Sequence, residues 1–392
     1  MRLLKFSVLA LFVFAGLGLP GIGVVEGQAP IEAPTGRCNG TNGFVDAATF
    51  AVDEAAFRRH YEAAEGLGPC YNAESCSDCH GNPCPGGNSQ VNNIQAGNRT
   101  GGVFTPHLGG TLIQERAIAW GIQDHLTPAD NVISLRMSPL IFGAGYVECI
   151  DDQTLIDIWS SEPPFLRGDM VKVPVVEGSG VLRVGRFGWK CVAASLPTMC
   201  GMEFTGQIGI TNSIAPADTC DPASDTVPDP EDGGDVDLGA FVQFARALKA
   251  PGRGPITPAV QAGESLFDQC GCSICHVNRI VTALPGTVLN GGTFVVPASL
   301  GNRIIHPYSD FLLHDIGTGD GIPTPGVSQT NKIRTAPLWG LILRTRYLHN
   351  GLAFSLQQAI AMHNGQALHS RICFNSLPPL LQANVISFLN SL

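Results

Sequence analysis

The stretch Cys76-Ser77-Asp78-Cys79-His80 decides the fold of this chain, and Cys272-Ser273-Ile274-Cys275-His276 repeats its pattern. In each stretch two thiols stand three residues apart, and a histidine follows directly. This spacing lets two cysteines bond the vinyl groups of a haem while the histidine reaches the iron. A zinc site pairing both CxxC units would ignore both histidines. We therefore predict two covalently bound haem c groups, held by Cys76, Cys79 and His80, and by Cys272, Cys275 and His276.

The segments around each motif predict short helices. Residues 47–64 show a helical hydrophobic face before the first motif, and Thr257-Pro258 caps a helix through Phe267 before the second. Amphipathic stretches at 237–250 and 377–392 can close the two halves. Gly 47 and Pro 28 together imply that long loops connect these helices.

We expect a mainly α fold with two cytochrome c-like haem domains. The boundary falls near Pro251 to Pro255, which gives an N-terminal domain over 28–252 and a C-terminal domain over 253–392. The first domain carries an insertion, because alternating residues around glycines between 171 and 189 predict a β-hairpin.

The N-terminus has the layout of an export signal. Arg2 and Lys5 precede an apolar run over 6–19, and small residues offer a cleavage point before Gln28. The run is short for a membrane span, which needs about 20 residues. We predict a signal peptide over 1–27, no membrane span in the mature chain, and a periplasmic or secreted location.

The cysteines and the charge fit such a compartment. Of 13 cysteines four belong to the haem motifs, and the odd remainder leaves at least one unpaired within the chain. An oxidising compartment permits disulfides, although the sequence does not fix their connectivity. The net charge of −10 argues against a nucleic-acid partner, which requires a basic surface.

The sixth ligand of each iron stays open on composition alone. The candidates are the histidines outside the two motifs and methionines such as Met137 and Met362. Those histidines are His60, His107, His125, His306, His314, His349, His363 and His369.

Several further stretches resemble the di-haem oxidoreductase family of peroxidase-like proteins and, more distantly, the bacterial di-haem cytochrome c peroxidases. They share glycine, tryptophan and histidine positions and cover most of residues 66–392. The stretches are 66–69, 72–76, 139–148, 185–190, 209–212, 308–317, 334–341, 347–351, 355–367 and 388–392.

The resemblance implies roles for particular residues. His363 corresponds to the distal ligand of the second haem, opposite His276, with Met362 as the competing ligand. Glu148 is the candidate acid–base group at the first haem, with a structural helix carboxylate or salt-bridge partner as the alternative. Arg334 is expected to neutralise haem propionates, and Trp339 either lies between the haems or packs in the core.

The resemblance also implies an activity. The protein would take electrons from a small redox protein through the C-terminal haem, and the N-terminal haem would reduce peroxide or another small oxidant. If His107 or His125 instead bound the first iron as its sixth ligand, the protein would be a non-catalytic electron-transfer cytochrome. A third reading is a haem protein that oxidises a partner protein over long range.

Overall fold

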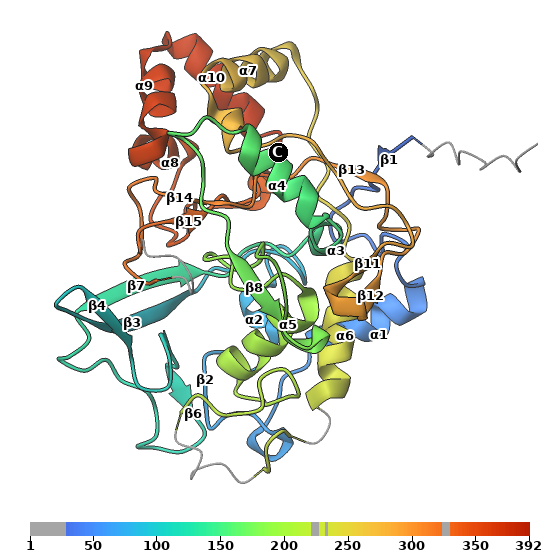
Figure 1. Cartoon of the computed structure of the whole chain (residues 1–392), viewed down its shortest axis with the longest axis vertical. Coiled ribbons are helices and arrows are strands. Elements are labelled where there is room, and N and C mark those ends of the chain that lie inside the picture. The colour runs from blue at the N-terminus through green and yellow to red at the C-terminus, as the bar shows by residue number, and fades with distance from the viewer. Residues whose placement is uncertain (1–28, 221–226, 232–233, 324–329) are drawn as a thin grey trace, which may run out of the picture.

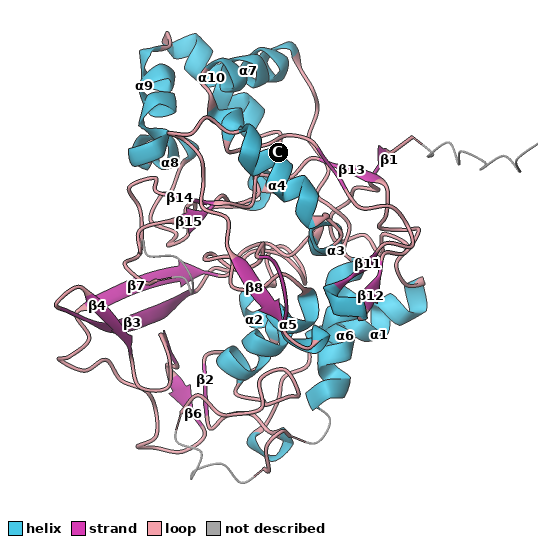
Figure 2. Ribbon diagram, viewed as in Figure 1, coloured by secondary structure: helices cyan, strands magenta, loops and turns pink. Residues whose placement is uncertain are grey.

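The computed structural model describes residues 29–220, 227–231, 234–323 and 330–392. The predicted signal peptide lies outside this part of the chain. The C-terminal helices gather at one end of the molecule and a second helical group lies below them, with α4 (Asp152–Ser161) between the two groups and the strands β3 (Asn92–Thr100), β4 (Val103–Pro106) and β7 (Val132–Met137) to one side (Figures 1 and 2). Within the described part, every helix falls short of the length and apolarity that a bilayer span requires.

The first helical group surrounds the first CxxCH motif. α1 (Ala47–Phe57) packs against α6 (Gly234–Ala247), and α5 (Leu196–Glu203) also contacts α6. α2 (Cys76–Cys79) holds the motif itself, and α3 (Ala144–Glu148) contacts α6 as well. The expected helix over 47–64 ends at Phe57, and the chain turns so that the Tyr61 amide donates to the Glu74 carbonyl.

Aromatic side chains fill the core of this group. The Phe57 and Phe244 rings lie 4.8 Å apart, and the Phe204 and Phe241 rings 4.9 Å apart. Aromatic pairs in these geometries stabilise a core beyond their buried area. They fix α1 against α6 and thereby define one side of the first haem motif.

The second helical group surrounds the second CxxCH motif. α7 (Pro258–Gln269) begins at Thr257, whose side chain accepts from the Val260 amide, as the sequence predicted. α10 (Pro379–Leu389) packs on α7 so closely that a Cβ at Gly263 would lie 2.0 Å from the Asn384 carbonyl oxygen. α8 (Leu356–Met362) and α9 (Leu368–Ser376) complete the group.

The expectation of a mainly α fold is wrong for residues 92–137. Here β3 (Asn92–Thr100) pairs antiparallel with β4 (Val103–Pro106), β5 (Leu112–Ile113) and β7 (Val132–Met137). The predicted hairpin is confirmed: β8 (Lys172–Val175) pairs with β9 (Val181–Val184), Lys172 opposite Val184.

Short elements connect the two helical groups. β1 (Ile31–Glu32) pairs parallel with β13 (Arg303–Ile305), so the start of the described chain lies on the C-terminal half. One buried cluster also joins Tyr146 and Leu155 to Phe294 and Phe311. The boundary near residue 252 stays a prediction. The remaining elements are α4 (Asp152–Ser161), β2 (Cys70–Tyr71), β6 (Arg116–Ala117), β10 (Ile280–Val281), β11 (Val288–Leu289), β12 (Phe294–Val295), β14 (Leu313–His314) and β15 (Ile333–Arg334).

Six of the nine cysteines outside the haem motifs form disulfides. The pairs are Cys38–Cys84, Cys70–Cys220 and Cys270–Cys373. Cys149, Cys191 and Cys200 are free thiols. Each bridge joins segments at least 46 residues apart. Cys38–Cys84 ties loops together, as expected from the sequence, whereas Cys270–Cys373 joins the end of α7 to α9.

Candidate haem sites

A cavity beside the second CxxCH motif, the C-terminal cavity, brings this motif together with the predicted distal histidine. About 190 Å³ of it is available to the centres of water-sized molecules. Cys272, Cys275 and His276 line it from one side of the sequence, and His363 from the end of α8. Met362 is absent from the described residues that line this cavity. The placement therefore favours His363 over Met362 as the second ligand.

The two histidines of the C-terminal cavity are prepared to bind a metal. His276 Nδ1 lies 2.9 Å from the Tyr308 carbonyl oxygen, and His363 Nδ1 lies 2.7 Å from the Ala359 carbonyl oxygen. Because a carbonyl only accepts, each Nδ1 carries the proton and each Nε2 keeps its lone pair. Burial lowers the pKa of His276 to about 4 and lowers the pKa of His363. Both rings are thus neutral, as iron ligands must be.

Three arginines line the same cavity: Arg334, Arg344 and Arg371. Arg334 donates through Nε to the Gly188 carbonyl at 2.7 Å, and burial lowers its pKa. Arg344 has a buried Nε without a hydrogen-bond partner, and none of the ion pairs in the described chain includes it. Burial, with the nearby Arg334 charge, lowers the pKa of Arg344 to about 10. A cavity-lining guanidinium without a carboxylate fits a haem propionate; the sequence indicated Arg334 but missed Arg344.

A buried polar cluster lies against the Cys275 side of the C-terminal cavity. His314 Nε2 lies 2.9 Å from Asp310 Oδ2, and His314 Nδ1 lies 3.7 Å from Cys275 Sγ. Burial alone would lower the pKa of His314, but the Asp310 charge raises it to about 11. Burial and the same Asp310 charge raise the pKa of Glu162 to about 8. Cys275, Asp310 and His314 could together hold a metal ion, but the haem attachment expected from the sequence would occupy the Cys275 sulfur.

A cavity beside the first CxxCH motif, the N-terminal cavity, has about 230 Å³ available to the centres of water-sized molecules. Cys76, Cys79 and His80 line it. Burial lowers the pKa of His80 to about 4, against a smaller opposite effect from backbone groups of Gly87 and Pro139. Its Nδ1 is buried without a well-oriented hydrogen-bond partner. These features fit a neutral proximal ligand.

His80 is the only histidine among the described residues that line the N-terminal cavity. The two histidines considered as closing ligands lie elsewhere. His107 Nδ1 pairs with Asp130 Oδ2 at 3.0 Å, just after β4. His125 does not line the cavity either. The structure therefore brings neither His107 nor His125 to this haem site.

The predicted acid–base residue Glu148 is placed away from the N-terminal cavity lining. It is fully buried and forms an ion pair with Arg246, whose Nε lies 2.7 Å from Glu148 Oε2. The Leu196 amide and the Asn290 side chain also donate to Glu148 Oε1. These contacts describe a structural ion pair that joins α3 to α6.

Glu203, at the end of α5, is the only carboxylate among the described residues that line the N-terminal cavity. The residue is exposed in the structure, where the cavity that it lines is open. Burial raises the pKa of its carboxyl group, which accepts a hydrogen bond of 3.2 Å from Gln207 Nε2. The sequence did not single out Glu203, because nothing local distinguishes it from other helical glutamates.

Three residues form a shared wall that lines both cavities: Trp189, Arg334 and Pro337. Trp189 Nε1 donates to the Met137 carbonyl at 2.7 Å, and the Arg334 amide donates to the Trp189 carbonyl at 2.8 Å. The Trp189 ring also lies edge-on to His349, 6.1 Å between centroids. Trp339 lines the N-terminal cavity but not the C-terminal one. The tryptophan between the two sites is therefore Trp189.

Two cavities, each with a CxxCH motif and a neutral histidine, fit a protein that binds two haems. A sequence profile described as "Di-haem oxidoreductase, putative peroxidase" matches residues 122–392. The chain belongs to this family and is an oxidoreductase enzyme with two haem groups. The matched region contains the second CxxCH motif and the shared wall, and it begins after the first motif.

Several solved structures have a similar course of the chain at low identity. Hydrazine synthase of Kuenenia stuttgartiensis is 15% identical, with 99% of this chain and 100% of that chain covered and a TM-score of 0.42. A MauG-like protein associated with microbial copper homeostasis is 15% identical (93% and 93% covered, TM-score 0.43). The di-haem peroxidase BthA of Burkholderia thailandensis is 13% identical (93% and 94% covered, TM-score 0.41). None of the curated proteins matches the sequence significantly.

Proposed function

We propose that this protein is an exported c-type di-haem peroxidase. A small redox protein would deliver electrons to the C-terminal haem, which passes them to the N-terminal haem. There hydrogen peroxide would take up two electrons and two protons and leave as two molecules of water.

The observation that carries this proposal is the difference between the two cavities. The C-terminal cavity presents His276 and His363 with both Nε2 atoms available, the ligand set of a six-coordinate iron. The N-terminal cavity presents His80 and no second histidine among its described lining residues. A peroxidatic haem requires an open or displaceable coordination position, and this difference supports one at His80.

The chain supplies a proton carrier where peroxide would bind. Bound haem would supply the redox chemistry of the iron, including its reaction with peroxide. Glu203 would accept one proton of hydrogen peroxide and return it to the departing oxygen, as general acid–base groups do. Its raised pKa brings the carboxyl group closer to the operating pH, where exchange in both directions is efficient. Gln207 would hold the carboxylate in place.

The shared wall would connect the two sites. Trp189 is fixed by its hydrogen bond to Met137 and by the Arg334 backbone. A rigid aromatic ring that lines both cavities is suited to electron passage between them. Arg334 places a positive charge at the same wall and would stabilise haem propionates.

Export and covalent attachment belong to the same proposal. Three disulfides in the described chain support an oxidising compartment. Both CxxCH motifs place their cysteines on the lining of a cavity, which supports covalent attachment. The periplasm or the exterior of the cell is the location that fits both the disulfides and covalent haem attachment.

A non-catalytic electron-transfer cytochrome is the second candidate. Met137 and Met199 line the N-terminal cavity, and a methionine thioether can bind haem iron. If one of them bound the iron permanently, both haems would be six-coordinate and peroxide would not react.

Electron paramagnetic resonance of the purified protein separates the two functions. The oxidised and half-reduced proteins should show one low-spin haem and one high-spin haem, and added peroxide should consume the high-spin signal. Two low-spin signals in every state, unchanged by peroxide, would overturn the peroxidase and support the electron carrier.

A further inference from the structure

A group of oxygen ligands lies far from both haem motifs in sequence, in the segment between α5 and α6. Asp218, Asp229 and Glu231 each place a carboxylate oxygen within 4.8 Å of the others. An ion at the centre of three atoms at this limit would lie about 2.8 Å from each, so a small inward movement of the carboxylates would reach Ca²⁺–oxygen distances of about 2.3–2.6 Å. Thr211 adds a hydroxyl, 2.8 Å from Asp229 Oδ1.

The carboxylate oxygens of Asp229 and Glu231 outnumber the hydrogen-bond donors that the group offers them. The Thr211 hydroxyl contacts Asp229 Oδ1 and also forms a short contact with Glu231 Oε2, although it has one proton to give. The other oxygen of Glu231, Oε1, is buried without a hydrogen-bond partner in the described chain. Glu231 as a whole is only 4% exposed. A buried carboxylate oxygen without a partner is costly, and this one therefore indicates a missing positive ligand.

The chain around Asp229 and Glu231 is poor in positive charge. From Phe204 to Ala245 the sequence contains no lysine, arginine or histidine, and residues 218–237 contain eight acidic residues. Within the described residues, neither Asp229 nor Glu231 forms an ion pair. Burial and the Asp229 charge raise the pKa of Glu231, as expected for carboxylates that lack a cation.

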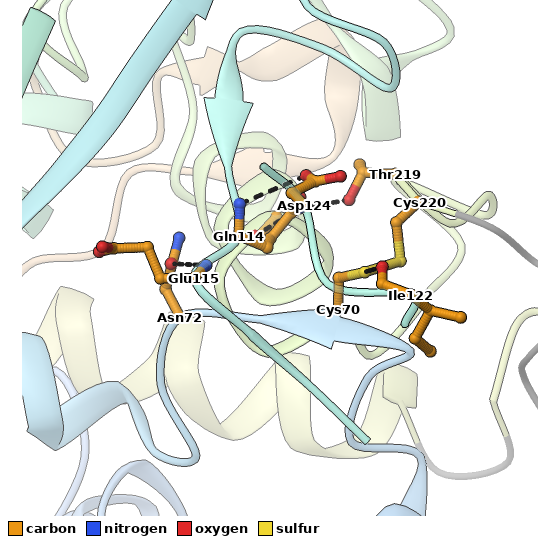
Figure 3. The surroundings of a disulfide bond; sticks show 9 residues. Cys70, Asn72, Gln114, Glu115, Ile122, Asp124, Thr219 and Cys220 are labelled. Atoms are coloured by element: carbon orange, nitrogen blue, oxygen red, sulfur yellow. Dashed lines mark hydrogen bonds between the residues drawn. A yellow bond between two sulfur atoms is a disulfide. The ribbon is translucent and has the colours of Figure 1, made fainter. Parts of the chain in front are cut away.

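The surrounding structure holds the group in place. Cys220, two residues after Asp218, is bonded to Cys70, and Thr219 accepts a hydrogen bond from Gln114 beside this bridge (Figure 3). On the other side, the Glu231 side chain packs against Gly66, where an added Cβ would lie 2.8 Å from Glu231 Cγ. The Gly234 amide, at the start of α6, donates to the Glu231 carbonyl at 3.0 Å.

We propose that Asp218, Asp229, Glu231 and Thr211 form a Ca²⁺ site that ties the disulfide-bonded loop to the start of α6. Hard oxygen ligands from an irregular loop suit Ca²⁺ better than Mg²⁺, which requires near-ideal octahedral geometry. α6 supplies Phe241 and Ala245 to the lining of the N-terminal cavity. The ion would therefore stabilise the helix beside the first haem without touching it.

Calorimetric titration of the purified di-haem protein tests this site. The protein is treated with EGTA, desalted and titrated with Ca²⁺ alone, and the thermal unfolding midpoint is measured with and without 5 mM Ca²⁺, roughly the range of extracellular calcium modules. We expect saturable binding, an upward shift of the midpoint with Ca²⁺, and weaker binding of Mg²⁺. Failure to bind Ca²⁺ would overturn the proposal.

Variants test whether Ca²⁺ binds at the proposed carboxylates. Glu231→Gln and, at the more exposed position, Asp229→Asn should each weaken Ca²⁺ binding at least tenfold and reduce the Ca²⁺-dependent midpoint shift. Asp229→Asn keeps the test valid if Glu231→Gln does not fold. Glu115→Gln removes an exposed carboxylate near the same disulfide (Figure 3) and should bind Ca²⁺ like the unaltered protein. Equal Ca²⁺ affinity in Asp229→Asn and Glu115→Gln would place any bound ion elsewhere and overturn the site. The haem electron paramagnetic resonance test is independent of these outcomes.

Discussion

The two haem cavities begin with the same five-residue motif but differ on the side that faces it. In the C-terminal cavity, His276 and His363 at the end of α8 both line the same space, and each Nδ1 is held by a carbonyl. The N-terminal cavity has no second histidine among its described lining residues. Its other lining residues include Glu203, Met137 and Met199. In the proposed function, the local motif would therefore hold each haem, whereas residues distant in sequence would determine whether its iron has a sixth ligand.

The largest expected effect comes from removing each attachment motif in turn. The double variant Cys76→Ser, Cys79→Ser should bind one haem in place of two and lose peroxide turnover to background. The matching variant Cys272→Ser, Cys275→Ser should also keep one haem, but its N-terminal haem should still react with peroxide in a single turnover. Haem content by absorbance and mass spectrometry, with rapid mixing against peroxide, measures both. Equal peroxide reactivity in the two variants would remove the functional difference between the cavities.

Removal of His363 tests whether the C-terminal iron is closed by this residue. His363→Ala should convert the low-spin signal of the C-terminal haem to high spin, because water or an empty position replaces an imidazole. His363→Met, the control, should keep a ligand and raise the reduction potential of this haem, as methionine does in cytochromes c. An unchanged low-spin spectrum in His363→Ala would show that another residue, such as Met362, binds the iron.

Glu203 and Glu148 provide a matched test of the acid–base group. Glu203→Gln should lower kcat/KM for peroxide about 100-fold, the usual contribution of general acid–base catalysis, with little change in stability. In the unaltered protein, activity should fall as the pH decreases through the pKa of Glu203, which burial raises above its ordinary value, because only the carboxylate can accept a proton from peroxide. The variant should lose this limb of the pH profile.

Glu148→Gln should lower stability and leave the activity unchanged. It breaks a buried ion pair with Arg246 and should cost about 3–5 kcal/mol of unfolding free energy, while the folded fraction keeps its peroxide activity and pH profile. Thermal unfolding and the pH dependence of kcat/KM measure the two effects. A Glu148→Gln protein that is stable but inactive would restore Glu148 as the acid–base group.

The parts of the fold that the sequence predicted are those with strong local signals. Thr257-Pro258 begins α7, and the alternation around Gly180 forms the β8–β9 hairpin, as expected. The sheet over residues 92–137 was missed, because its strand β3 reads Asn92-Asn-Ile-Gln-Ala-Gly-Asn-Arg-Thr100, with few of the β-branched and aromatic residues typical of strands. Its stability depends on pairing with β4, β5 and β7.

The candidate site divides in the same way. The CxxCH cysteines and histidines, and His363 on a resemblance, line the cavities where the sequence placed them. Glu203 and Arg344 could not be selected, because their importance lies in the cavity they face and in the partners they lack. Trp189 lay within a stretch that resembles the family, but only the tertiary structure distinguishes it from Trp339 as the residue shared by both cavities.

The smallest expected effect concerns this choice between the two tryptophans. Trp189→Phe keeps an aromatic ring but removes the donor to the buried Met137 carbonyl, at a cost of about 1–3 kcal/mol in unfolding free energy. Electron transfer from the C-terminal to the N-terminal haem should become slower, because the ring that lines both cavities loses its fixed position. Trp339→Phe changes a buried ring on one cavity only and should leave the transfer rate unchanged. The half-reduced protein is mixed rapidly with peroxide, and oxidation of the C-terminal haem is followed by absorbance. If Trp339→Phe slowed this oxidation and Trp189→Phe did not, electrons would pass around the shared wall, and the two cavities would communicate through the core that contains Trp339.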